Sequence, residues 1–365
     1  MNSREVTLSE PIRLTSMAKA AGCAAKMHPG TLESVLRRLP PQTDPNVLVG
    51  FNTNDDAGIY LLNDSLALVQ TIDFFTPIVD DPFIFGQIAA ANALSDVYAM
   101  GGRPISALSV VGFPDKGDPA ILEQIMRGGL NKMMEANCSV IGGHSLRNED
   151  VQFGYAVTGL IDPKKVWKNV GAQPEDILLF TKPLGTGVIS TALKNNRASQ
   201  ESMDASIASM TRLNRITSDA LRQAESHLGA HCIHAVTDVT GFSLLGHARE
   251  MALGDPANGI SSVSIEFQHS EFNFLPGALQ AVREGFIPGG LTNNRNFIDD
   301  CVDFTANVSE EYRALLFDPQ SSGGLLVAVA PEAAEKTLAI MQARDIPAKR
   351  VGRVLGKTSP LISVL

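Results

Sequence analysis

Carboxylates at the ends of short segments are the residues of this chain best suited to chemistry. Asp55 and Asp56 lie in a predicted loop before a short apolar run. Asp73 ends a run that predicts a strand, and Asp96 lies on a predicted helix. Mg²⁺ prefers hard oxygen ligands, and proteins typically hold it with one or two carboxylates and the phosphates of a nucleotide. The sequence therefore predicts a magnesium–nucleotide site where these three segments meet, with unrelated loop aspartates as the alternative.

The helix that carries Asp96 is the clearest element in the sequence. Apolar residues recur at helical spacing from about residue 83 to residue 100, and Gly101 and Gly102 end the pattern. Asn92, Ser95 and Asp96 stand at i, i+3 and i+4, so they project from one face. A carboxylate beside two small polar groups is a candidate cation ligand set, although a single aspartate on a helix is usually just solvated.

A fourth carboxylate and a pair of glycines extend this candidate site. Asp238 ends a predicted strand and precedes a predicted helix, which makes it a candidate fourth ligand. Gly142 and Gly143 follow a short apolar run, and paired glycines let backbone N–H groups approach a phosphate or a base closely. A simple chain turn is the alternative at the two glycines. His144, the next residue, either binds the nucleotide or caps that loop.

A thiol near the N-terminus is the candidate nucleophile. Cys23 is followed three positions later by Lys26. The thiolate is the reactive form of cysteine, and a neighbouring ammonium group lowers the thiol pKa. The two side chains are neighbours on a helical turn and point apart on an extended segment. Coincidence is therefore the alternative to a reactive pair.

The composition indicates an ordinary globular protein. The chain has 365 residues, of which 44% are hydrophobic and 19% charged, and a single core stops growing near roughly 250 to 300 residues. Two domains are therefore expected, with a boundary near Gly171. A formal charge of −9 and the lack of a basic run argue against a nucleic-acid surface. No stretch is long and apolar enough to predict a membrane span or a signal peptide.

Cysteine usage and the remaining patterns complete the expectations. Four scattered cysteines without a Cys-x-x-Cys pair predict neither a disulfide framework nor a zinc site, so we expect a cytoplasmic location. The pattern at 119–135 predicts a helix that buries Met126, Leu130 and Met134 among other apolar residues. Residues 204–227 predict one long helix, and residues 288–297 predict a loop.

Taken in order, several motifs resemble those of one enzyme family, selenophosphate synthetase, also called selenide, water dikinase. The resemblance runs from about residue 12 to the C-terminus and has high joint specificity. The matching segments are Gly22-Cys23-x-x-Lys26, Asn54-Asp55-Asp56-Ala57, 71–75, 92–104, Gly142-Gly143-His144, Thr181-Lys182-Pro183-Leu184-Gly185, 237–242, Pro288-Gly289-Gly290 and 318–324.

The resemblance implies a mixed α/β fold of the aminoimidazole ribonucleotide synthetase type with two domains. A mobile catalytic flap would span residues 1–30, a domain for ATP and Mg²⁺ binding and for dimerisation residues 31–170, and a C-terminal α/β domain residues 171–365. The protein would form a homodimer through its N-terminal domains. The reaction would convert ATP, selenide and water to selenophosphate, AMP and phosphate, supplying activated selenium for selenocysteine or selenouridine synthesis. A selenium-delivery protein would be a further partner.

The resemblance also implies residue roles. Cys23 would be the catalytic thiol, and Lys26 would be its essential partner and would also contact the nucleotide. The implied metal ligands are Asp56, Asp96 and Asp238. Mg²⁺ is the implied cation, with a monovalent cation such as K⁺ as a candidate addition. The residues implied to contact the nucleotide are Thr53, Asn54, Asp55, Asp73, Asp96, Gly142, Gly143 and His144.

Departures from the family pattern and alternative functions stay open at this point. Many relatives read Gly-Cys-Gly-Cys-Lys, whereas this chain has Ala24 and Ala25 between Cys23 and Lys26. No mechanism here can therefore depend on a cysteine pair. The loop after Gly290 is about two residues longer than the expected pattern. The first alternative function is a sister enzyme that phosphorylates an amide or a thiamine-type substrate, and the second is a non-catalytic selenium or nucleotide carrier.

Overall fold

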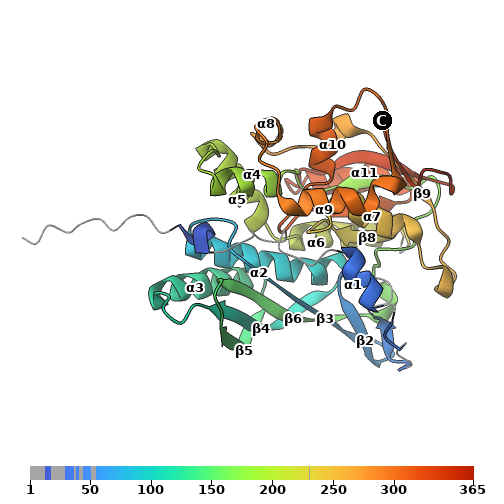
Figure 1. The fold of residues 1–365 in the computed structure, drawn as a ribbon. Helices are drawn as coiled ribbons and strands as arrows, with labels where there is room; N and C mark the ends of the chain where they lie inside the picture. The colour runs from blue at the N-terminus through green and yellow to red at the C-terminus, as the bar shows by residue number, and fades with distance from the viewer. Residues whose placement is uncertain (1–12, 18–28, 37, 41–43, 51–54, 230) are drawn as a thin grey trace, which may run out of the picture.

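The computed structural model describes residues 13–17, 29–36, 38–40, 44–50, 55–229 and 231–365. Two β-sheets organise these residues, one built from the first half of the chain and one from the second (Figure 1). The helix α2 (Pro82–Ala99) runs between them. Of the described helices, none combines the length and apolarity that crossing a bilayer requires.

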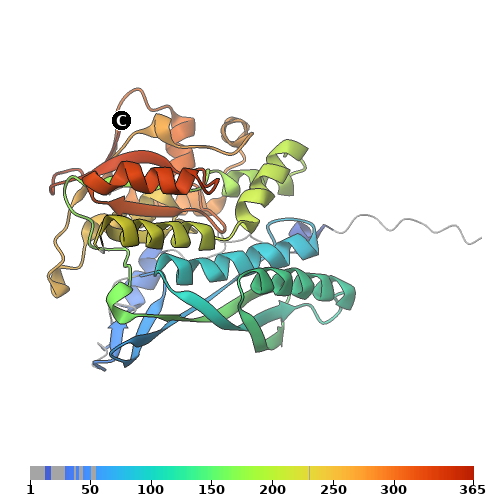
Figure 2. The ribbon, with the colours of Figure 1, turned by 180° about the vertical axis from the view of Figure 1, so that it is seen from behind.

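The first sheet has six strands in the order β1-β2-β3-β6-β4-β5. Its neighbouring strands pair antiparallel except β4 and β5, which are parallel. Helices α2 and α3 lie on one face of this sheet (Figure 2). The elements of this half are β1 (Val47–Val49), β2 (Gly58–Asn63), β3 (Leu66–Phe75), β4 (Arg103–Phe113), β5 (Ser139–Arg147), β6 (Gln152–Ile161), α1 (Pro29–Leu36), α2 and α3 (Pro119–Glu135), with a short 3-10 helix over Leu14–Met17.

The second sheet has seven strands in the order β10-β13-β9-β12-β7-β11-β8. Its strands are β7 (Ile177–Phe180), β8 (Ile233–Asp238), β9 (Ser264–Phe267), β10 (Val302–Phe304), β11 (Leu325–Val329), β12 (Lys349–Leu355) and β13 (Ile362–Val364). Its helices are α4 (Thr186–Lys194), α5 (Gln200–Thr211), α6 (Arg215–Leu228), α7 (Ser243–Leu253), α8 (Ala278–Arg283), α9 (Gly289–Ile298), α10 (Glu310–Leu316) and α11 (Pro331–Gln342).

Helix α2 forms because its ends are well specified and its body is apolar. Asp81 caps the first turn by accepting a hydrogen bond from the backbone N–H of Ile84, and Pro82 occupies the first helical position. Gly101 follows the helix with a φ of +76°, a conformation that favours glycine. The helix packs on β3 and β6 on one side and against α5, α6 and β8 on the other. Its polar face therefore meets the second half of the chain, not solvent.

Two expected elements differ in the structure. The single helix predicted over 204–227 is wrong, because α5 ends at Thr211 and α6 begins at Arg215. Asn214, at the break, is buried and donates hydrogen bonds to Ser95 Oγ and to the Gly323 carbonyl, both at 2.8 Å. The loop predicted over 288–297 is also wrong, since helix α9 occupies Gly289–Ile298.

Candidate nucleotide and metal site

Carboxylates from three elements gather where the two sheets approach each other. Asp55 and Asp56 precede β2, Asp96 lies on α2, and Asp238 ends β8. Burial raises the pKa of the Asp56 carboxyl well above its usual range, and the charges of Asp238, Asp96 and Asp55 raise it further. The structure thus brings together four of the predicted site residues, which are far apart in the sequence.

Hydrogen bonds hold these carboxylates in position. Thr237 Oγ1 donates to Asp56 Oδ1 at 2.9 Å, and Thr71 Oγ1 donates to an oxygen of Asp96 at 2.5 Å. The backbone N–H of Asn169 donates to Asp55 Oδ1 at 2.8 Å. Two of these three donors, Thr237 and Asn169, lie beyond the first sheet in the sequence. The position of Asp56 therefore depends on how the two halves of the chain meet, and that of Asp55 depends on the segment that joins them.

The donor set fits a hard divalent cation. Asp56 Oδ2 is buried and has no hydrogen-bond partner among the described residues. Within those residues, no three His, Cys, Asp or Glu side chains form a cage that could hold a metal ion. Mg²⁺ does not need such a cage, because it keeps several waters and binds one or two carboxylates together with substrate phosphates. A zinc-type cage of nitrogen and sulfur ligands is not what these oxygens would form.

Asp73 joins the site from the same side of the first sheet. It is buried near the end of β3 and accepts a hydrogen bond from Asn92 Nδ2 on α2. Asn92 Oδ1 in turn accepts the backbone N–H of Ser322 at 2.7 Å. Asp73 is thereby linked through α2 to a loop of the second half of the chain.

Gly142, Gly143 and His144 lie apart from the carboxylates. They belong to the edge strand β5, which continues through them to Arg147, so the turn considered for the two glycines is wrong. Strands β6 and β4 separate β5 from β3, a distance of about 14 Å at the usual strand spacing. His144 pairs in register with Val110, on the face of the sheet opposite to α2. These three residues therefore do not lie next to the carboxylates of their own chain.

Four further predicted site residues, Cys23, Lys26, Thr53 and Asn54, lie outside the described residues. Pro29 at the start of α1 and Asp55 before β2 are the nearest described residues after them. Their proposed roles remain predictions from the sequence.

Comparison with known proteins places the chain in a family. The model of the AIR synthase related protein, N-terminal domain, matches residues 54–161, and that of the corresponding C-terminal domain matches residues 173–362. The chain is 48% identical over 346 residues to a selenide, water dikinase of Pelobacter propionicus, covering 94% of this chain and 96% of the relative. It is 41% identical over 358 residues to the enzyme of that name from Clostridioides difficile, covering 98% and 99% of the two chains. This chain belongs to the selenide, water dikinase family.

Solved structures confirm the expected fold. A thiamine-monophosphate kinase from Stenotrophomonas maltophilia has a TM-score of 0.61 at 17% identity, covering 93% of this chain and 96% of that chain. Hydrogenase maturation protein HypE in complex with ATP has a TM-score of 0.54 at 19% identity, covering 87% of this chain and 84% of that chain. At such low identity the likeness establishes the two-part AIR synthase-like fold alone.

The site of this selenide, water dikinase family member also contains residues that sequence reasoning missed. Thr71, Thr237 and Asn214 make hydrogen bonds to site residues, and all three looked like ordinary strand or helix residues in the sequence. Thr237 directly precedes Asp238, and this position next to a predicted metal ligand is the one sequence signal that indicates a role for it. Lys182 belongs to one of the motifs that resemble the family, but the sequence predicts no role for it. Its ammonium group is buried next to the loop that reaches Asn92.

The glycines at Gly185 and Gly187 do not form a free phosphate cradle. Gln320 Oε1 accepts the backbone N–H of Gly185 at 3.0 Å and that of Thr186 at 3.2 Å. Asp318 Oδ2 accepts the N–H of Gly187 at 2.9 Å. Burial raises the pKa of the Asp318 carboxyl to about 7, against the effect of its hydrogen bonds. The segment after Phe317 therefore caps helix α4 with the protein's own side chains.

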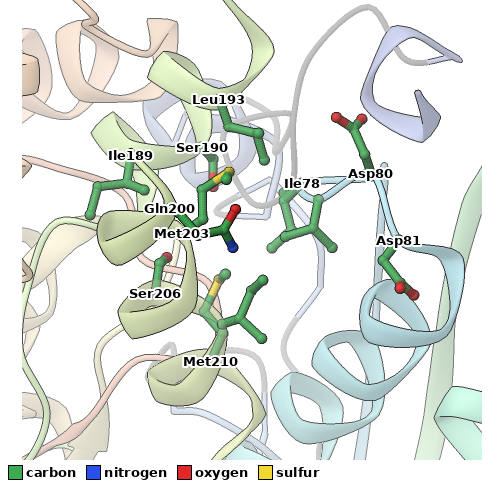
Figure 3. A pocket seen from close by; sticks show the side chains of 12 residues that line it. Ile78, Asp80, Asp81, Ile189, Ser190, Leu193, Gln200, Met203, Ser206 and Met210 are labelled. Atoms are coloured by element: carbon green, nitrogen blue, oxygen red, sulfur yellow. The ribbon is translucent and has the colours of Figure 1, made fainter. Parts of the chain in front are cut away.

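A cavity of about 270 Å³ lies beside the segment that precedes α2 (Figure 3). Ile78 and Asp81 line it from the first half of the chain, and Met203 and Met210 line it from α5. Asp81 caps the start of α2, whereas Asp96 lies about 22 Å further along the helix at 1.5 Å per residue. This apolar cavity is therefore distinct from the carboxylate site.

Proposed function

We propose that this protein catalyses the ATP-dependent synthesis of selenophosphate from selenide and water, releasing AMP and phosphate. The observation that carries the proposal is the convergence of Asp56, Asp96 and Asp238 in a chain whose curated relatives are named selenide, water dikinase. The product would supply activated selenium for selenocysteine or selenouridine synthesis.

The carboxylates would hold the metal and orient the nucleotide. In this proposal Asp56, Asp96 and Asp238 hold Mg²⁺, while Asp55 and Asp73 contact the nucleotide together with Thr53 and Asn54. Bound Mg²⁺ supplies neutralisation of the phosphate charge. A monovalent cation such as K⁺ is a further proposed requirement. Phosphoryl transfer depends on positioning and charge stabilisation more than on covalent chemistry, and a carboxylate cluster fixed by hydrogen bonds suits that need.

The N-terminal segment would supply the reactive groups. Cys23 would hold or deliver selenide as its thiolate, and Lys26 would lower the thiol pKa and meet the moving phosphoryl charge. We accordingly divide the chain into a catalytic flap over 1–30, a nucleotide-binding domain over 31–170 and a C-terminal domain over 171–365. The free thiols of Cys138 and Cys232 and an oxidisable substrate favour a reducing cytoplasm.

The open face of the first sheet supports a homodimer. Helices α2 and α3 cover one face, and the opposite face exposes Ile72, Phe74 and Leu108, with exposed fractions of 58%, 43% and 46%. Single exposed apolar side chains are common, but several of them on one sheet face, here on β3 and on β4 beyond the intervening β6, mark an interaction surface. A second copy of the chain packed on this face would bury these side chains. A selenium-delivery protein is a further proposed partner.

The same face carries Gly142 and His144. They pair in register with Leu108 and Val110, whose side chains point away from α2. In the proposed homodimer these residues face the partner protomer. Their contact with a nucleotide would then be made in the partner's site and not in their own. This would account for their distance from Asp73 of the same chain.

Phosphorus NMR tests the proposed reaction. The protein would be incubated anaerobically with ATP, Mg²⁺ and selenide, beside a Cys23→Ala variant. Selenide-dependent formation of selenophosphate and AMP, lost in the variant, is the expected result. If ATP stays intact, the carrier alternative applies. If ATP is converted only to ADP, with or without selenide, the chain is a sister kinase and the proposed reaction is wrong.

A further inference from the structure

Lys182 is a buried cation that the proposed mechanism does not use. It follows β7 at the edge of the second sheet where β8 ends in Asp238 and where β11 begins. Only 4% of the residue is exposed. Burial lowers the pKa of its ammonium group to about 7, and the charge of Arg212 lowers it further, while that of Asp238 opposes the shift. A buried ammonium is costly unless its surroundings use it.

The contacts of Lys182 are backbone carbonyls from two separate loops. Its Nζ donates to the carbonyl oxygen of Ser322 at 2.8 Å and to that of Arg212 at 2.7 Å. Among the ion pairs of the described residues, none includes Lys182. The side chain therefore clamps main chain, and its loss would leave both carbonyl groups without this donor.

The first loop leads directly to the nucleotide side of the site. Ser322, whose carbonyl accepts from Lys182, donates its backbone N–H to Asn92 Oδ1 at 2.7 Å. Asn92 Nδ2 donates to Asp73. Ser322 has a φ of +47°, which is unfavourable for a residue with a side chain. The surrounding contacts, including that of Lys182, must hold this conformation.

The second loop reaches the same face of α2. Arg212 begins the break between α5 and α6, and Asn214 follows two residues later. Asn214 Nδ2 donates to Ser95 Oγ and to the Gly323 carbonyl. Lys182 thus binds both segments that form hydrogen bonds to α2, one segment at Asn92 and the other at Ser95.

We propose that Lys182 is a positioning residue for the nucleotide site: it holds the Ser322 loop and the α5–α6 break against α2 and, through Asn92, fixes Asp73. This inference rests on the proposed function only in taking Asp73 as a nucleotide contact. Lys182 acts through other residues and does not itself touch the substrate.

A double-mutant cycle tests the inference. Binding of a non-hydrolysable ATP analogue with Mg²⁺ would be measured by calorimetry for the parent, Lys182→Met, Asn92→Ala and the double variant. We expect Lys182→Met to weaken binding about 10-fold, and the double variant to bind much as Asn92→Ala alone, because both act along one path. Lys336→Met is the control, since it removes the same charge at an exposed position of α11. It should bind as the parent does.

Steady-state kinetics distinguishes positioning from a general loss of folded protein. The KM for ATP should rise about 10-fold in Lys182→Met while the KM for selenide stays unchanged. Fluorescence of Trp167, the only tryptophan, would verify folding. If Lys182→Met does not fold, Lys182→Gln, whose amide keeps a donor, replaces it in the cycle.

Three outcomes would overturn the inference. Unchanged nucleotide affinity in the folded Lys182 variant is the first, and additive effects of the two substitutions are the second. The third is a fall in kcat with unchanged KM for ATP. A parent protein that binds no nucleotide would instead contradict the proposed function, and the inference with it.

Discussion

Thr237 Oγ1 lies 2.9 Å from Asp56 Oδ1 and donates a hydrogen bond to it across 181 positions of sequence. Thr237 belongs to β8 of the second sheet, and Asp56 precedes β2 of the first. The bond lowers the pKa of the Asp56 carboxyl, which burial and three neighbouring carboxylates raise. One hydroxyl group of the second half of the chain therefore helps to keep a proposed metal ligand of the first half ionised.

Removing this hydroxyl should impair the site with little effect on the fold. Thr237→Val keeps the side-chain shape but leaves Asp56 without its donor, so we expect selenophosphate formation to fall about 10-fold, as for other residues that orient metal ligands. The free energy of unfolding should fall by about 1 kcal/mol. Thr211→Val, which removes a hydroxyl bonded only to the Ile207 carbonyl, is the control for urea unfolding and activity. Equal activity of the two variants would contradict the role of Thr237.

A charge on the open face of the first sheet should prevent dimerisation. Phe74→Glu places a carboxylate among the exposed apolar side chains, and burying it in an interface without a partner is strongly unfavourable. Light scattering after size-exclusion chromatography should show a dimer for the parent and a monomer for the variant. Met134→Glu changes an exposed side chain of α3 and should leave the dimer intact. A parent that is monomeric would refute the homodimer.

Complementation between two inactive variants should reveal which protomer His144 serves. Cys23→Ala and His144→Ala would be co-expressed with different tags, and the mixed dimer would be purified by both. If His144 contacts the partner's nucleotide, one of the two sites keeps both native residues, and about half of the parent activity should return. If His144 serves its own protomer, both sites carry a defect. No recovery of activity would then be seen.

Stability should depend on pH through Asp318. The pKa of its carboxyl is about 7 in the folded chain and near 3.8 in the unfolded chain, so folding retains a proton that unfolding releases between these values. The contribution of the protonated Asp318 carboxyl to the free energy of unfolding is fully present below about pH 4, and it is lost as the pH rises through about 7. Asp318→Asn cannot ionise. As the pH rises from about 4 to about 8, the free energy of unfolding of this variant should increase by a few kcal/mol relative to that of the parent.

Urea unfolding at several pH values checks this expectation. Asp303→Asn is a suitable control, because Asp303 is exposed on the edge strand β10. Parallel pH profiles for the parent and the Asp318 variant would contradict the argument.

Sequence periodicity predicted the elements that carry the carboxylates. Helix α2 was expected over 83–100 and spans Pro82–Ala99, and α3 was expected over 119–135 and spans those residues. These segments combine a regular apolar pattern with clear ends, so local signals suffice. The four described carboxylates Asp55, Asp56, Asp96 and Asp238 are near one another, as the family resemblance implied.

Features that depend on contacts between distant segments could not be predicted. Nothing local marks the break between α5 and α6, because Asn214 interrupts the helix to reach Ser95 and Gly323. Gly142 and Gly143 looked like a turn, yet they continue an edge strand. A side chain on Gly143 would meet Ser109 Oγ at 2.1 Å, so the glycine is needed for close approach of β4.

The burial predicted for α3 was partly wrong. Ile125 and Met133 are buried, but Met126, Leu130 and Met134 have exposed fractions of 42%, 47% and 67%. Apolar residues surround this helix on more than one side, and the sequence does not tell which side the sheet covers.

The polar face of α2 also limits how this protein can be divided. Asn92 and Ser95 are fully buried only because Ser322 and Asn214 pack on them and complete their hydrogen bonds. A fragment ending near residue 170 would lose these partners of Asn92 and Ser95 and would expose the apolar residues around them to water. The two halves must therefore be exchanged together. A chimera that joins the first half of one relative to the second half of another must keep residues that complete these contacts on both sides of the interface between the halves.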